Sequence, residues 1–178
     1  RLGFERACKK TNIRSECVFT AEIKNHALTV YNQNFGENNA KTDITSVASD
    51  KIPEFDVLLG GFPCQAFSDA GRRRGFEDTR GTLFFDIARI LRDKSPRAFV
   101  LENVESLFRH DKGKTFEIVL NTLRELGYFV SYKTLNACDF SIPQNRKRAF
   151  IVGSKTDFVS LDFEPKPSVR VKDVLEPL

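Results

Sequence analysis

The chain has 178 residues, of which 40% are hydrophobic and 29% are charged, and it carries a formal net charge of +4. These values are ordinary for a globular domain that buries a core of its own. No apolar run is long enough to span a bilayer and no signal peptide opens the sequence, so we expect neither a membrane protein nor a secreted one. The mild positive charge permits a nucleic-acid partner without requiring one.

The cysteines show no pattern typical of a metal site. Cys8, Cys17, Cys64 and Cys138 are scattered, no two of them have C-x-x-C spacing, and the chain has 2 His. Structural zinc sites need Cys and His ligands at characteristic spacings. We therefore expect no metal, and thiols that stay reduced inside a cell.

Taken in chain order, short apolar runs alternate with helical patterns. The expected elements are a helix over 1–10, a strand over 17–21, a helix over 24–35, a strand over 56–60, a helix over 82–92, a strand over 98–101, a helix over 115–126, and strands over 129–135 and 149–153. This alternation predicts an α/β domain with a mostly parallel sheet. A short connection joins the last two strands, so one of them is expected to be antiparallel.

The pattern changes after residue 157. The segment 158–178 holds 3 of the 7 prolines and shows no periodicity. We expect a domain over residues 1–157, followed by a linker over 158–178.

Three reactive side chains follow three of the expected strands. Glu22 comes after the first strand, Cys64 after the second and Glu102 after the third. Ligands of open α/β sheets bind outside the carboxyl ends of the strands. The sequence therefore predicts a site where these side chains converge on one rim of the sheet.

Cys64 has two interpretations. Free cysteines are often small buried residues, yet this one follows two glycines and a proline, where the chain turns off a strand. It would act as a nucleophile only if nearby cations favoured its thiolate. The candidate cations are Arg72, Arg73, Arg74, Arg146 and Arg148. Neither His occupies an obvious partner position, which argues against a Cys–His hydrolase.

The two acids also have ordinary alternatives. Glu102 could cap a helix or form an ion pair, or it could donate a proton or a hydrogen bond in catalysis. Glu22 could likewise cap a helix or form an ion pair, or it could accept the ribose hydroxyls of a nucleotide-like ligand. The glycine fingerprint that usually precedes such an acid is absent, so Glu22 alone is a weak signal.

Two basic clusters remain open to interpretation. Arg72–Arg74 lies between Gly71 and Gly75 and is either a solvated surface or a grip for phosphates. In the second cluster, Arg146 and Arg148 alternate along an extended segment and would point to the same side. That arrangement suits a charged backbone or a carboxylate in the site.

Four motifs together resemble those of cytosine-C5 DNA methyltransferases, and in particular the bacterial modification enzymes. They are the Pro-Cys-Gln stretch Gly60–Ser68, the segment Gly75–Asp86, the Glu-Asn-Val stretch Glu102–Val104 and the Gln-x-Arg-x-Arg stretch Gln144–Arg148. Each motif alone is a weak signal. All four stand in the family's order, and the resemblance covers the chain from Arg1 to about Gly153.

The resemblance implies a Rossmann-like fold, S-adenosylmethionine as cofactor and double-stranded DNA as partner. It assigns catalytic roles to Cys64, Glu102, Arg146 and Arg148. Cys64 would add to C6 of a flipped-out cytosine, and Glu102 would contact N3 and the exocyclic amine. A loop from Phe67 to Gly81 would close over the base. The implied DNA contacts are Gln65, Ser68, Arg72, Arg73, Arg74, Arg80 and Gln144.

The resemblance also implies a cofactor pocket. Glu22 matches the acid that binds the ribose, and Ile23, where the family often has Trp, matches a residue that packs on adenine. Asp43 and Ile44 match the pair that meets the adenine ring. Pro63 and Leu83 match residues that line the pocket.

Two parts of the family pattern have no counterpart in the sequence. The first is the opening strand with its Phe-x-Gly-x-Gly loop, and the second is the target-recognition domain with the closing motif. We therefore expect an incomplete core in a bacterial cytoplasmic enzyme, low activity of the chain by itself, and a complementing segment as a further partner. The alternatives are a transfer-RNA cytosine methyltransferase, a non-catalytic relative and an unrelated thiol enzyme.

Overall fold

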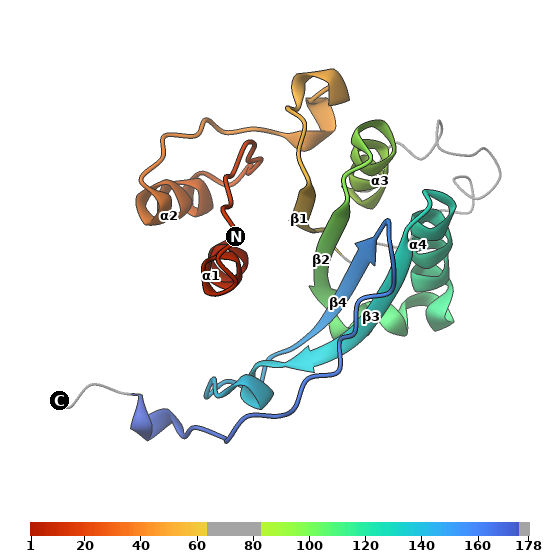
Figure 1. Cartoon of the computed structure of the whole chain (residues 1–178). Coiled ribbons are helices and arrows are strands. Elements are labelled where there is room, and N and C mark those ends of the chain that lie inside the picture. The colour runs from red at the N-terminus through yellow and green to blue at the C-terminus, as the bar shows by residue number, and fades with distance from the viewer. Residues whose placement is uncertain (64–82, 175–178) are drawn as a thin grey trace. The chain divides into compact units, whose positions relative to one another are not determined.

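The computed structural model describes residues 1–63 and 83–174 (Figure 1). The chain divides into two compact units, Arg1–Phe55 and Asp56–Leu178. No helix among the described residues has the length and apolar character needed to cross a membrane.

The first unit is built from two α-helices and two short 3-10 helices. They are α1 (Leu2–Lys10), α2 (Asn25–Phe35), η1 (Ile44–Ser46) and η2 (Ser49–Lys51). The chain leaves α2 through Gly36, whose φ of 63° is left-handed. Glycine adopts this conformation without a steric penalty, which is why the helix ends at the predicted residue.

The strand expected over 17–21 is absent, and this prediction was wrong. No strand is assigned among the described residues of the first unit. Strand backbone needs a neighbouring strand to pair its N–H and C=O groups. The segment is instead held by side chains, since the Thr20 and Tyr31 hydroxyls lie 2.9 Å apart and the Cys17 thiol lies 3.6 Å from the Tyr31 hydroxyl.

The second unit contains a four-stranded sheet in the order β1-β2-β4-β3 (Figure 1). The strands are β1 (Val57–Gly61), β2 (Ala98–Val104), β3 (Phe129–Asn136) and β4 (Lys147–Ser154). β1 pairs with β2 in parallel, and β4 pairs antiparallel with both β2 and β3. Three strands therefore run in one direction and the fourth runs against them, which confirms the predicted α/β fold with one antiparallel strand near the end.

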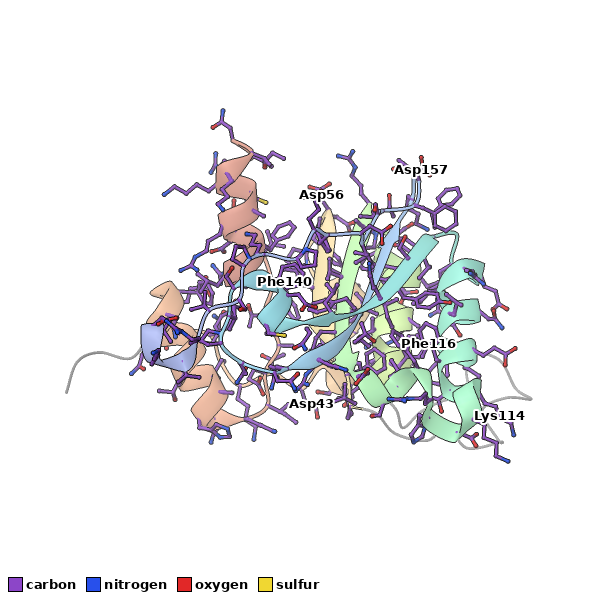
Figure 2. All side chains as sticks on the ribbon, turned by 90° about the horizontal axis from the view of Figure 1, so that it is seen from below. Asp43, Asp56, Lys114, Phe116, Phe140 and Asp157 are labelled. Carbon is purple, nitrogen blue, oxygen red and sulfur yellow. The ribbon has the colours of Figure 1, made fainter. Side chains whose placement is uncertain are left out.

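Two amphipathic helices, α3 (Leu83–Lys94) and α4 (Lys114–Glu125), share the core of the second unit with the sheet. Phe99 and Leu101 of β2 are fully buried, while Val100 between them is less buried. The helices contribute Ile87, Leu91, Val119 and Leu123 to the same cluster. Full burial of such side chains stabilises the fold by about 1.5–3 kcal/mol each. At the start of α4, Figure 2 shows Phe116 turned toward the sheet and Lys114 turned away.

The second unit also contains short 3-10 helices. They are η4 (Glu105–Phe108), η5 (His110–Gly113), η6 (Ala137–Phe140) and η7 (Val171–Asp173). Of residues 158–174, only η7 is helical. At the start of this segment, the ring of Phe158 lies 5.2 Å from that of Phe129 in β3. The role of this segment as a linker stays a prediction.

Gly153 of β4 lies directly against the ring of a buried phenylalanine in β2. It pairs with Phe99 across β2 and β4. A Cβ atom added at Gly153 would lie 2.1 Å from Cε1 of the Phe99 ring. Because that ring is fully buried, it has no free space into which it could move. Only glycine fits at this position.

We predict that Gly153→Ala lowers the free energy of unfolding by about 3 kcal/mol, because the added methyl group overpacks the core. Urea unfolding measures the change. Ser131→Ala in β3, opposite Val152 on the other face of the sheet, is the control and should shift stability by less than about 0.5 kcal/mol. A Gly153→Ala protein as stable as the wild type would contradict the argument.

Candidate functional site

The acid at the end of β2 lies within the strand and does not follow it. We expected the strand to end at Leu101, but β2 continues through Val104. Pairing with β4 extends it, because Glu102 stands opposite Phe150 and Val104 stands opposite Arg148. The Glu-Asn-Val motif is therefore held on a paired strand.

Arg148 forms an ion pair with Glu102, with Arg148 Nε 2.9 Å from Glu102 Oε1. The two side chains are 24% and 43% exposed. The pair lies at the edge where β2 ends and β4 begins. A carboxylate held by a guanidinium in this way has a fixed orientation and remains open to a ligand.

Arg146 and Gln144 lie in the connection that leads into β4. The Arg146 N–H donates to Asn136 Oδ1 at 2.9 Å, and the Ala137 N–H donates to the Arg146 carbonyl at 3.0 Å. The Gln144 N–H donates to the Ile142 carbonyl at 2.7 Å. Both long side chains are exposed, so the backbone is anchored while the polar groups face solvent.

The predicted nucleophile lies outside the described residues, together with most of the predicted DNA contacts. These residues are Cys64, Gln65, Ser68, Arg72, Arg73, Arg74 and Arg80. The residues on either side of them are described. Phe62 is buried and its ring lies 5.3 Å from that of Phe84. Pro63 is exposed, and Leu83, the first residue of α3, is partly buried against the core.

Gly61 brings β1 close to the Glu102 side chain. The two residues are partners in the β1–β2 pairing. A Cβ atom at Gly61 would lie 3.3 Å from the Glu102 carbonyl oxygen and 3.7 Å from Oε2 of its carboxylate. The segment that leads to Cys64 therefore starts beside Glu102.

Asn103 was not predicted as a site residue. It is only 3% exposed, and its Nδ2 donates to the Phe62 carbonyl at 2.8 Å. The signal in the sequence was its place in the alternation, because the buried positions two and four residues earlier carry Leu101 and Phe99. A polar side chain at a core-facing position needs a partner, and here the partner is the backbone before Cys64.

The first unit brings together the residues predicted to hold adenosine. The Thr42 N–H donates to the Glu22 carbonyl at 3.0 Å, so the segment with Glu22 and Ile23 lies against the one with Asp43 and Ile44. Ile23 is 48% exposed, which leaves an apolar side chain open to a ligand. The predicted convergence of Glu22 on the rim that carries Glu102 stays a prediction.

The carboxylates of Glu22 and Asp43 both accept hydrogen bonds from residues close in sequence. Oε1 of Glu22 accepts the Lys24 N–H at 2.8 Å. Oδ1 of Asp43, labelled in Figure 2, accepts the Thr45 hydroxyl at 2.8 Å and the Thr45 N–H at 3.0 Å. These bonds, the one from the hydroxyl first, hold the pKa of Asp43 below its usual value. Asp43 is therefore a fixed anion at neutral pH.

Across residues 1–63 and 83–174, no group of three or more His, Cys, Asp or Glu side chains is arranged to hold a metal ion. The chemistry of the described site rests on carboxylates, guanidinium groups and one buried amide.

Two solved structures that are similar to this chain come from the Dnmt2 group. The DNMT2 structure of Spodoptera frugiperda matches 98% of this chain and 56% of its own, with a TM-score of 0.75 at 20% sequence identity. The Dnmt2 methyltransferase of Schizosaccharomyces pombe gives a TM-score of 0.67 at 25% identity over 97% of this chain and 51% of its own. The second unit, with its acid at the end of β2, thus has the architecture of this class of enzyme.

The family is shown by sequence. The model of the C-5 cytosine-specific DNA methylase family matches residues 1–176, and the chain belongs to this family. The type II methyltransferase M.NgoBV of Neisseria gonorrhoeae is 54% identical over 99% of this chain and 43% of its own. M.HhaI of Haemophilus parahaemolyticus is 48% identical over 92% of this chain and 51% of its own. The chain spans about half the length of these relatives.

We predict that Glu102→Gln or Arg148→Gln lowers the free energy of unfolding by less than about 1 kcal/mol. The pair is half-exposed, and solvent screens such pairs. Urea unfolding of both single variants and the double variant measures the coupling. Lys133→Gln, which breaks the exposed Lys133–Asp162 pair, is the control for an ordinary surface pair. A loss near 3 kcal/mol, typical of a broken buried pair, would show that Glu102 and Arg148 are structural.

Proposed function

We propose that this chain is the catalytic part of an enzyme that transfers a methyl group from S-adenosylmethionine to C5 of cytosine in DNA. The observation that carries the proposal is the junction of β1 and β2. There the backbone that leads to Cys64 lies beside the Glu102 carboxylate and is tied to the neighbouring Asn103. The reaction needs a nucleophile and a group that recognises the base within one nucleotide's reach. The described backbone up to Pro63, which passes beside Glu102, supports this arrangement.

The chemistry follows from the weak nucleophilicity of C5. The Cys64 thiolate adds to C6, which pushes electron density onto C5 while Glu102 holds N3 and the exocyclic amine. C5 would then attack the methyl group of S-adenosylmethionine, whose sulfur–methyl bond breaks to leave S-adenosylhomocysteine. Loss of the C5 proton to a base and elimination of the Cys64 thiolate would release the methylated base. A thiolate cannot reach C6 inside the stack, so the base is first flipped out of the duplex.

Arg148 acts through Glu102 in this scheme. Their ion pair orients the carboxylate, and the exposed Arg146 holds the sugar-phosphate of the flipped base. The DNA is contacted by the Arg-rich stretch Arg72–Arg74 and by Gln65, Ser68, Arg80 and Gln144. Residues 1–157 form the catalytic core in the bacterial cytoplasm, and 158–178 lead toward the part that reads the DNA sequence.

The residues of the first unit suit S-adenosylmethionine, which supplies an electrophilic methyl group when bound. The Glu22 carboxylate accepts ribose hydroxyls, because a carboxylate takes more hydrogen bonds than the one from Lys24. The exposed Ile23 and its neighbour Ile44 pack on adenine. Asp43, kept anionic by Thr45, accepts a hydrogen bond from the adenine edge.

We predict that the longest natural form of the protein, incubated with S-adenosylmethionine and DNA that carries 5-fluorocytosine, forms a covalent adduct at Cys64. Fluorine at C5 cannot leave as a proton does, so elimination is blocked. Denaturing gels and mass spectrometry detect the adduct. Cys64→Ala should give none, while Cys138→Ala, which changes another free thiol, should react as the wild type does.

The same experiment separates the alternatives. An adduct with transfer RNA and none with DNA would move the substrate to RNA. An adduct without any need for S-adenosylmethionine would indicate an unrelated thiol enzyme. No adduct with either nucleic acid, while the cofactor still binds, would indicate a non-catalytic relative and refute the mechanism.

A further inference from the structure

Asn103 is a buried amide in the core of the second unit, and both its oxygen and its nitrogen form hydrogen bonds. A buried amide is costly unless its polar atoms are paired. Its Oδ1 accepts the Val104 N–H at 2.8 Å. Since an N–H must face an acceptor, this bond fixes the orientation of the amide and directs Nδ2 at the Phe62 carbonyl, also 2.8 Å away.

The bond from Asn103 replaces a missing backbone bond. The parallel register of β1 and β2 ends with Gly61 opposite Glu102. One step further, Phe62 would stand opposite Asn103, but the chain has already left the sheet. The side chain of Asn103 thus continues the pairing of the two strands by one residue, at the point where the chain departs toward Cys64.

We infer that Asn103 is a positioning residue that holds the backbone leading to the nucleophile beside the strand of the acid that holds the base. It holds the peptide of Phe62, two residues before Cys64, against the strand that carries Glu102. The buried Phe62 ring packs on Phe84 and anchors the same residue. This inference rests on the proposed function, because it assigns the bond a role in that reaction.

A purely structural role for Asn103 predicts a different result. Loss of a core hydrogen bond lowers stability and affects binding and rate only through the folded fraction. Loss of a positioning bond lowers the rate of thiolate addition while the dissociation constants for cofactor and DNA stay unchanged. A displacement of about 1 Å is enough to cost about 100-fold in rate.

Asn103→Asp tests the inference, because it keeps the shape and changes the donor. As a carboxylate it repels the Phe62 carbonyl, and as a carboxylic acid it donates to that carbonyl again. Burial favours the neutral form of an acid. We predict that at about pH 8 the rate of adduct formation by Asn103→Asp is about 100-fold below that of the wild type. At about pH 6 the ratio of the variant's rate to the wild-type rate should be at least tenfold higher than at about pH 8.

Two further variants complete the test. Asn103→Ala has no donor at any pH, so its ratio to wild type should stay low and flat. Asn34→Asp is the matched control, because Asn34 Nδ2 also donates to a backbone carbonyl at 2.8 Å but on an exposed helix surface. It should react as the wild type does at every pH. The titratable neighbours of Asn103 in β2 and β4, Glu102 and Arg148, are unchanged throughout, so their titration cancels in the ratios.

The outcomes are distinct. Asn103→Asp and Asn103→Ala rates within threefold of wild type, or an Asn103→Asp ratio that does not change with pH, would overturn the inference and leave the proposed function intact. No adduct with the wild-type protein would refute the proposed function, and the inference would fall with it. If Asn103→Asp does not fold, Asn103→Ala decides the question. A lower rate of adduct formation with unchanged dissociation constants for cofactor and DNA supports positioning. A loss of rate matched by an equal loss of cofactor and DNA binding overturns it.

Discussion

The contact between the Phe99 ring and Gly153 determines how β2 and β4 align. Because only a residue without a Cβ atom fits over that ring, the two strands have one permitted register. That register places Val104 opposite Arg148 at the far end of the pairing, and the Glu102–Arg148 ion pair follows from it. A slip of one residue would turn every side chain of β4 to the other face. The electrostatics of the site thus depend on a packing constraint five residues away along β4.

Glu102 and Asn103 are neighbours in β2, but their side chains lie on opposite faces of the strand and make different interactions. Successive side chains of a strand point to opposite sides, so Glu102 meets Arg148 on the more open face while Asn103 is buried among core residues. The open face carries the charge that a ligand can reach. The covered face carries an amide whose bond to the Phe62 carbonyl is shielded from water. The neighbouring β1 is tied to both residues, through the close approach of Gly61 and through Phe62.

The sequence correctly predicted the elements whose signals are local. The predictions failed where a strand's existence or length depends on pairing with another strand. The helix before Gly36 and the strand over 56–60 follow from periodicity and a stop residue. The apolar run over 17–21 has the composition of a strand, but strand formation needs a partner that composition does not reveal. Glu102 and Asn103 interrupt an apolar run, so β2 was predicted to end too early, although pairing with β4 extends it. The ion pair with Arg148 depends on β4 lying between β2 and β3, which no local pattern encodes. Asn103 was overlooked because its partner is a backbone carbonyl.

The strand order also has a consequence for synthesis. β4 is the last strand of the sheet to be made, yet it lies between β2 and β3. While the ribosome has released the chain only as far as β3, these two strands have no common neighbour, and their facing edges are unpaired. Unpaired edges invite association with other chains. The emergence of β4 closes both edges at once and brings Arg148 to Glu102, so a nascent chain acquires its sheet and its charged site in the same late step.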